Sequence, residues 1–83
     1  MREVILDTET TGLDPKTGHR LVEIGAVELI NHTPTGVNYQ TYINPERNVD
    51  AGAQEIHGLT NEFLKQHPTF ADISVEFMSF LSD

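Results

Sequence analysis

The first half of the chain holds three strand-like segments joined by short, turn-rich connections. Residues 3–9 carry the apolar run VIL, residues 21–30 read LVEIGAVELI, and residues 37–43 alternate apolar with polar side chains. These patterns predict three strands, although AVELI in the second is also compatible with a helix. The connections over residues 10–20 and 31–36 are shorter than the roughly a dozen residues that a parallel crossover takes. The strands are therefore expected to form an antiparallel meander.

The first strand has a composition typical of a strand that is buried on both faces, since VIL does not alternate with polar residues. Such a strand needs two neighbours, and only the second segment is obviously available. The last helix also presents more apolar surface than a three-stranded sheet covers well. Both observations predict a fourth strand just beyond Asp83. Residues 1–83 are therefore expected to be the N-terminal part of a single, larger domain.

The second half of the chain is predicted to be helical. Residues 50–57 favour a short helical turn that stops at Gly58, where glycine accepts a left-handed conformation. Thr60 is a suitable N-cap for a second short helix over residues 61–66, which Pro68 ends.

The last helix is predicted from residue 70 to the C-terminus. Thr69 is a good N-cap, and Asp72 stands where a capping-box acid belongs. The apolar side chains beyond it recur at helical spacing and form one stripe: Phe70, Ile73, Phe77, Phe80 and Leu81.

Bulk composition excludes several classes of protein. The chain of 83 residues is one domain at most, and the absence of cysteine rules out disulfides and cysteine-based zinc sites. A reducing compartment is the natural default for such a chain. The N-terminal apolar run is too short for a signal peptide, and no segment approaches the roughly 18 apolar residues of a membrane span. A soluble cytoplasmic protein is expected.

The net charge limits how the chain can meet nucleic acid. A formal charge of −8, from 13 acids against five Lys and Arg, argues against a domain that grips long stretches of phosphate backbone. Any nucleic-acid function is therefore expected to work through metal ions or a tethering partner.

Asp7 and Glu9 follow the first apolar run directly. Two residues apart on a strand, they project to the same face, with backbone positions about 6.6 Å apart. Carboxylates are suitable ligands for Mg²⁺ or Mn²⁺, and two such cations about 3.5–4 Å apart are the usual device for phosphodiester cleavage. In so acidic a chain the spacing also arises by chance, and a solvated strand end would need no metal. Placement after a buried strand favours the metal site, because a desolvated carboxylate needs compensation.

Five segments, in order along the chain, resemble one known family. They are LDTETTGL at residues 6–13, LVEIGAVELI at 21–30, YINP at 42–45, IHGLT at 56–60 and PTFADISVEFMSFL at 68–81. Together they resemble the DnaQ-type 3′→5′ exonucleases of the DEDD superfamily, and among these the proofreading enzymes of replication. The resemblance implies an α/β, ribonuclease H-like exonuclease fold, of which this chain is the N-terminal, incomplete portion.

The resemblance also implies roles for the two carboxylates and for the residues that follow. Asp7 would bridge two Mg²⁺ or Mn²⁺ ions, while Glu9 would bind one of them and help to orient the attacking water at the 3′ end. The terminal nucleotide would lie against the residues after the strand, with glycine permitting close approach and leucine packing on a base: Thr10, Thr11, Gly12 and Leu13. For the two threonines, ordinary turn capping is the alternative.

The histidines are expected to differ in role. By resemblance His57 contacts the terminal nucleotide and is not the general base, although a satisfied turn histidine is an equal alternative. The remaining three lie beside polar residues and are expected to be solvated: His19, His32 and His67. One departure from the family is Gly52, where some members carry a carboxylate, so a substrate contact from that position is in doubt.

The family's remaining motifs are absent from these residues. An N-A-x-F-D motif would begin a little beyond Asp83, and the general-base histidine with the last aspartate would lie further on. The chain alone is therefore expected to bind metal weakly and not to cleave DNA at a useful rate. The implied partners are the 3′ end of DNA and the catalytic subunit of a polymerase, which would raise the effective concentration of that end. A DnaQ-type exonuclease of RNA or of repair, and a catalytically dead binding or structural module, are the alternatives.

Overall fold

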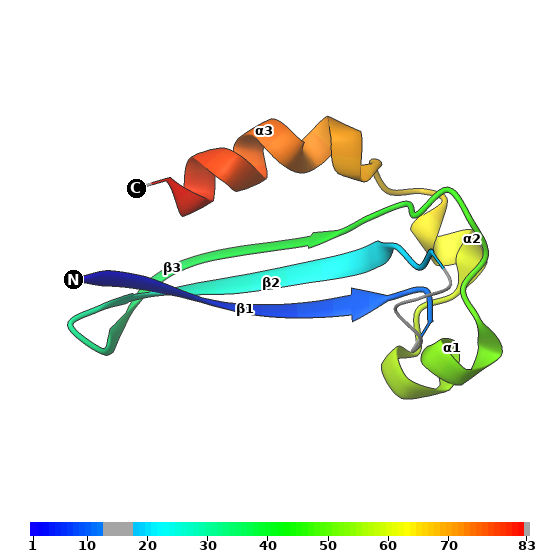
Figure 1. Cartoon of the computed structure of the whole chain (residues 1–83), viewed down its shortest axis with the longest axis horizontal. Coiled ribbons are helices and arrows are strands. Elements are labelled where there is room, and N and C mark those ends of the chain that lie inside the picture. The colour runs from blue at the N-terminus through cyan, green and yellow to red at the C-terminus, as the bar shows by residue number, and fades with distance from the viewer. Residues whose placement is uncertain (13–17, 83) are drawn as a thin grey trace.

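The computed structural model describes residues 1–12 and 18–82. A single sheet of order β1-β2-β3 is antiparallel throughout, and helices follow it (Figure 1). The elements are β1 (Arg2–Thr10), β2 (Leu21–Ile30), β3 (Thr33–Tyr42), α1 (Ala51–His57), α2 (Asn61–Leu64) and α3 (Phe70–Leu81). The predicted meander followed by helices is confirmed.

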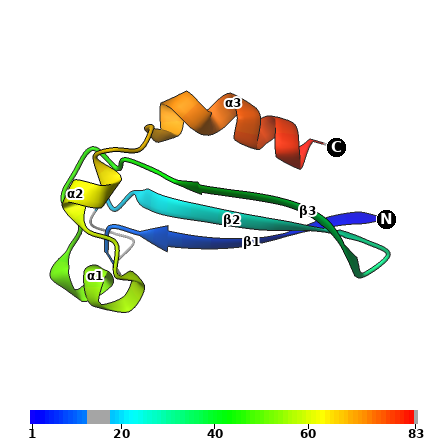
Figure 2. The same cartoon turned by 180° about the vertical axis from the view of Figure 1, so that it is seen from behind.

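The helices occupy two places around the sheet. Helix α3 lies along one face, whereas α1 and α2 gather beyond the end of the sheet at which β1 finishes (Figures 1 and 2). In the part of the chain that the structure describes, no helix covers the opposite face of the sheet. None of the described helices is long and apolar enough to cross a membrane.

The hairpin between β2 and β3 is tighter than predicted. Asn31 and His32 alone form the turn, both with positive φ (50° and 68°), as a two-residue hairpin turn requires. The expected six-residue turn over residues 31–36 is therefore wrong, and β3 begins at Thr33. Its proline, Pro34, is tolerated because β3 is an edge strand. A register shift between Val27 and Leu29 accommodates the additional residues that β3 has there.

Strand β1 is an edge strand in this chain and not a buried one. Ile5 is 56% exposed and Leu6 is 49% exposed, which contradicts the predicted burial on both faces. The physical reason is that β1 pairs only with β2 among the described residues, and that its outer face meets no helix.

Two small clusters form the core. One joins the sheet to α3 through Ile24, Ile43 and Ile73, with Tyr39 and Phe77 packed against them. The Tyr39 hydroxyl donates a hydrogen bond to Glu76 of α3 (2.8 Å), and burial, aided by that carboxylate, raises the pKa of Tyr39 to about 12. The other cluster holds α1 and α2 against the end of the sheet: Val22, Val49, Ala53 and Leu64.

The predicted helix caps are present. Gly58 ends α1 in the left-handed conformation, with φ 74°. The Thr60 side chain accepts a hydrogen bond from the Phe63 amide at the start of α2. Thr69 and Asp72 form a complete capping box at the start of α3.

Candidate active site at the end of strand β1

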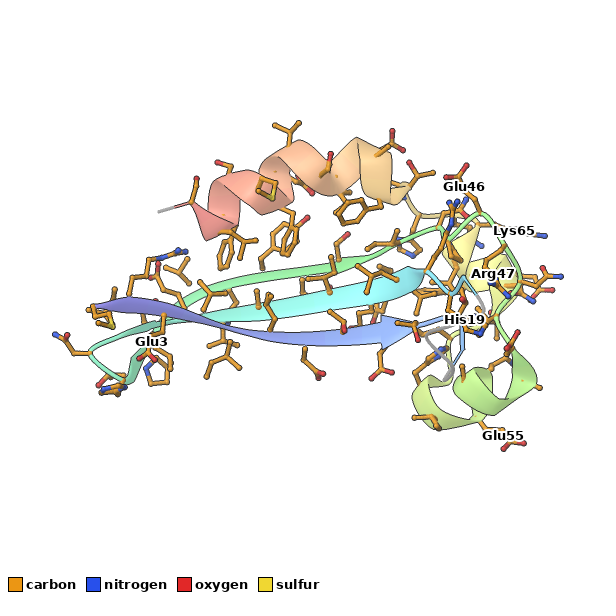
Figure 3. All side chains as sticks on the ribbon, viewed as in Figure 1. Glu3, His19, Glu46, Arg47, Glu55 and Lys65 are labelled. Carbon is orange, nitrogen blue, oxygen red and sulfur yellow. The ribbon has the colours of Figure 1, made fainter. Side chains whose placement is uncertain are left out.

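Asp7 and Glu9 lie on the face of the sheet turned away from α3. Figure 3 shows Glu3 on that side of β1. Side chains two residues apart on a strand share a face, so Asp7 and Glu9 follow Glu3 there. The pairing of β1 with β2 supports this placement. Glu9 lies opposite Glu23 on one face, whereas the next residue of β2, Ile24, points to the other face and packs against α3.

Both carboxylates are available to a ligand. Asp7 is exposed and Glu9 half-buried, and neither forms a hydrogen bond or ion pair with the described residues. Glu23 lies directly opposite Glu9 but turns its carboxylate to the Gln40 amide at 2.9 Å. Like charges that face each other across a sheet are destabilising, so this arrangement favours the arrival of a cation.

The donor set fits a divalent metal only in part. Two carboxylates on one face supply the hard oxygen ligands that Mg²⁺ and Mn²⁺ prefer. Among residues 1–12 and 18–82, however, no group of three or more His, Cys, Asp or Glu side chains converges on one point. Asp7 and Glu9 are therefore two candidate ligands, fewer than a divalent cation needs.

The backbone after Glu9 is tied down at three successive residues. Thr10 donates from its hydroxyl to the Gly12 carbonyl (2.5 Å), and its own carbonyl lies 3.1 Å from His57 Nε2. The Thr11 amide donates to the Arg20 carbonyl (2.9 Å). Residues 10–12, here named the ledge, are thus held in a fixed conformation beside the two carboxylates.

Thr11 lies inside the protein. Its exposed fraction is 0%, and its hydroxyl accepts from the Arg20 amide (3.1 Å) and lies 2.8 Å from His19 Nδ1. In this conformation the side chain is enclosed by protein, and its expected contact with a nucleotide stays a prediction. The hydroxyl is needed to satisfy the buried end of the loop.

His57 connects α1 to the end of β1. Its Nδ1 accepts a hydrogen bond from the Leu59 amide (3.0 Å), so Nε2 carries the proton and donates to the Thr10 carbonyl (3.1 Å). Both ring nitrogens therefore have protein partners, as the satisfied-turn alternative requires. A contact with substrate would use the ring face or edge.

Two of the three histidines expected to be solvated are not. The side chain of His19 is only 5% exposed, and His67 packs on Phe63 with ring centroids 4.6 Å apart. Only His32 is open to solvent. Sequence reasoning missed His19 because its burial depends on Asp50, which lies far along the chain, and no local pattern reports that contact.

Other positions add little to the site. Leu13 lies outside the described residues. Gly52 stands on α1 with open space around it, so the departure from the family creates no packing defect. Glu23 adds charge near the carboxylates without reaching them.

The sequence model of a protein family named RNase T, described as exonuclease, matches residues 4–83. The chain belongs to this exonuclease family. The membership agrees with the resemblance seen in the five sequence segments.

Curated relatives of the family cover nearly the whole chain. DNA polymerase III subunit epsilon of Rickettsia felis is 57% identical over 83 residues, which are 100% of this chain and 36% of the relative. The subunit of the same name from Escherichia coli K12 is 45% identical over 84 residues, 96% of this chain and 35% of the relative. The chain thus spans little more than a third of the length of these relatives.

Solved exonucleases share the fold. Exonuclease X in complex with 5′ overhanging duplex DNA superposes with a TM-score of 0.76 at 27% identity, over 89% of this chain and 42% of that one. Exonuclease I in complex with an inhibitor superposes with a TM-score of 0.84 at 20% identity, over 99% of this chain and 19% of that one. The sheet and helices therefore form the N-terminal portion of a ribonuclease H-like exonuclease fold.

Proposed function

We propose that this chain is the N-terminal part of a metal-dependent 3′→5′ exonuclease that proofreads DNA 3′ ends, as a subunit epsilon of DNA polymerase III. One observation carries the proposal: Asp7 and Glu9 lie on one face of β1 without a hydrogen bond or ion pair to the described residues, in a chain that belongs to an exonuclease family. Residues 1–83 are then one part of a single exonuclease domain.

Asp7 and Glu9 hold the metal ions in this proposal. Two Mg²⁺ or Mn²⁺ ions supply a nucleophilic water at neutral pH and charge neutralisation of the leaving oxygen. Asp7 and Glu9 would hold these ions through their carboxylate oxygens, and Glu9 would also orient the attacking water. The remaining ligands and the general base come from residues beyond this chain.

The ledge after β1 receives the terminal nucleotide. Thr10 would present backbone there and Leu13 would pack on the base, whereas Gly12 is buried, with its carbonyl bound by the Thr10 hydroxyl. His57 offers its ring edge, since its nitrogens already bind Thr10 and Leu59. Thr11 supports the ledge from beneath.

The acidic surface fits an enzyme that is brought to its substrate. A chain of net charge −8 gains little from phosphate attraction, whereas tethering to the alpha subunit of a polymerase raises the local concentration of a frayed 3′ end. A C-terminal region of the longer protein supplies that tether, in the cytoplasm.

Two other functions are favoured by particular observations. The family match and the likeness to Exonuclease X suit a repair or RNA exonuclease of the same type equally well. The lack of three converging ligands among the described residues suits a binding or structural module without catalysis. The substrate preference and the activity of a chimaera with a full-length relative would separate these functions from proofreading.

The experiment uses a chimaera in which this chain replaces the 83 aligned residues of the Rickettsia felis subunit. We expect it to shorten single-stranded DNA from the 3′ end in Mg²⁺ or Mn²⁺, and EDTA to stop the reaction. Asp7→Ala or Glu9→Ala should lower kcat at least about 100-fold with an unchanged melting temperature. Glu55→Ala, on the exposed side of α1, is the matched control.

Retained activity in the Asp7→Ala chimaera would contradict the metal assignment. Faster cleavage of RNA than of DNA would favour the repair or RNA exonuclease. A folded but inactive chimaera would favour the binding or structural module. The position of a label at the 3′ or the 5′ end of the DNA decides the direction of cleavage.

A further inference from the structure

We propose that His19 is a positioning residue, which holds residues 10–12 in the shape that receives the terminal nucleotide. The inference rests on the proposed function for its consequence in catalysis, but its structural half can be tested without any activity. His19 lies at the end of the sheet where β1 finishes (Figure 3), and nothing in the sequence motifs assigned it a role.

The ring of His19 is enclosed and uses both nitrogens. Its side chain is 5% exposed, with Nδ1 2.8 Å from the Thr11 hydroxyl and Nε2 3.3 Å from Asp50 Oδ2. A Cβ at Gly12 would lie 2.1 Å from the ring, so the glycine lets the ring close on the backbone. The imidazole therefore packs directly against the backbone at Gly12.

The direction of the hydrogen bonds follows from the surroundings. The Thr11 oxygen accepts from the Arg20 amide at 3.1 Å, which leaves the hydroxyl proton free to be donated to His19 Nδ1. Nε2 then carries the ring proton and faces the Asp50 carboxylate at 3.3 Å, an electrostatic contact. Hydrogen bonds thus join Arg20, Thr11 and His19, and the contact with Asp50 extends this group to the start of α1.

Two backbone hydrogen bonds connect the same residues. The Thr11 amide donates to the Arg20 carbonyl (2.9 Å), and the Asp50 amide donates to the Thr11 carbonyl (2.7 Å). Thr11 is therefore hydrogen-bonded on one side to Arg20, just before β2, and on the other to Asp50, at the start of α1. His19 bridges those two sides, so its loss frees the ledge without touching the two carboxylates.

The position of the ledge decides how a nucleotide sits beside Asp7 and Glu9. Residues 10–12 follow Glu9 directly, and a displacement of about 1 Å at a substrate contact can lower a rate about 100-fold. The ring itself is too enclosed to meet substrate. His19 acts through the backbone that it holds.

Amide exchange in the 83-residue chain tests the structural half. In His19→Ala we expect the amides of Thr11 and Asp50 to exchange about tenfold faster, because the hydrogen bond with Thr11 and the contact with Asp50 are both lost. The Ile43 amide, bonded to the Val22 carbonyl in the core, should keep its rate. His32→Ala, in the exposed hairpin turn, is the matched control.

Two conservative variants separate the two polar contacts of the ring. In His19→Asn the amide oxygen stands near the place of Nδ1 and can accept from Thr11, whereas in His19→Gln the amide group reaches toward Asp50. Because the ledge is held through Thr11, we expect Asn to restore slow exchange better than Gln. Equal exchange in all variants would overturn the inference, and so would an Ile43 amide that accelerates with the others.

Kinetics in the chimaera test the consequence for the proposed reaction. KM does not depend on the fraction of enzyme that is folded, so a purely structural loss lowers the apparent kcat alone. We expect His19→Ala to raise KM for a single-stranded DNA end about tenfold, and His19→Asn to stay within about threefold of the parent. An unchanged KM would overturn the role in substrate positioning.

The two proposals fail in different ways. An inactive parent chimaera, or an active Asp7→Ala chimaera, counts against the proposed function only. Exchange rates in the 83-residue chain still decide whether His19 holds the ledge.

Discussion

A glycine at residue 12 is required for packing in this fold, and no special backbone angle explains it. A Cβ there would overlap the His19 ring, so the ring or the loop would have to move. The sequence resemblance predicts a glycine here for close approach of substrate, whereas the enclosed histidine already demands one for packing. One residue can thus serve the fold and the proposed site together.

The glycines at residues 12 and 52 should respond in opposite directions to the same change. Gly12→Ala is expected to lower the free energy of unfolding by about 1–3 kcal/mol, because it overpacks the space against His19. Gly52→Ala lies on α1 with open space around it and should raise that free energy by about 0.5–1 kcal/mol. Urea denaturation of both variants measures the difference. Equal effects would contradict the packing role of Gly12.

At the scale of elements, α3 is fastened to the sheet at its C-terminal end by one arginine. Arg2 donates to the carbonyls of Phe80 (2.7 Å) and Leu81 (3.2 Å), and its guanidinium lies 5.3 Å from the Phe80 ring centre. The same side chain pairs with Glu28 of β2 at 2.6 Å. A cation beside the last helix carbonyls is favourable, so Arg2 caps a helix that lies 78 residues away in sequence.

This contact makes part of the stability depend on pH. The hydrogen bonds from Arg2 and Thr35 hold the pKa of Glu28 below its usual value. Stability from a carboxyl with a lowered pKa is fully present above the unfolded pKa and is lost as pH falls through the folded one. We expect Glu28→Gln to lose less stability than the parent between about pH 5 and pH 3, measured by thermal unfolding. Glu55→Gln is the matched control, and parallel curves for parent and Glu28→Gln would contradict the prediction.

On the scale of the whole molecule, one face of the sheet is uncovered in the described chain, and β1 and β3 are both edge strands. Ile5 and Val27 are exposed on the face that carries Asp7 and Glu9, and the outer edge of β1 has no partner strand. An edge strand beside an exposed apolar patch is prone to pair with another chain. The rest of a longer exonuclease domain would cover this surface.

The 83-residue chain is therefore expected to self-associate. Sedimentation velocity should show a mean mass that rises with concentration over the micromolar range. Ile5→Lys, on the open face of β1, should reduce that rise, whereas Val75→Lys, on the outer side of α3, should reduce it less. A monomer with a sharp, reversible unfolding transition at every concentration would contradict this prediction.

The sequence by itself determined the elements. Alternation along residues 37–43, the caps at Thr60 and Thr69 and the stop at Gly58 act over a few residues, so strands and helices could be placed to within a few positions. Asp7 and Glu9 could be placed on one face for the same reason, since strand periodicity is local.

Only the tertiary structure decided the contacts between distant residues. His19 is buried because Asp50 and Gly12 close around it, and Arg2 caps α3 because the meander brings the start of β1 to the end of the last helix. The hairpin turn shortened because pairing along the whole of β2 outweighed the turn signals around Pro34. Such contacts depend on how the elements pack, and no pattern within a few residues encodes them.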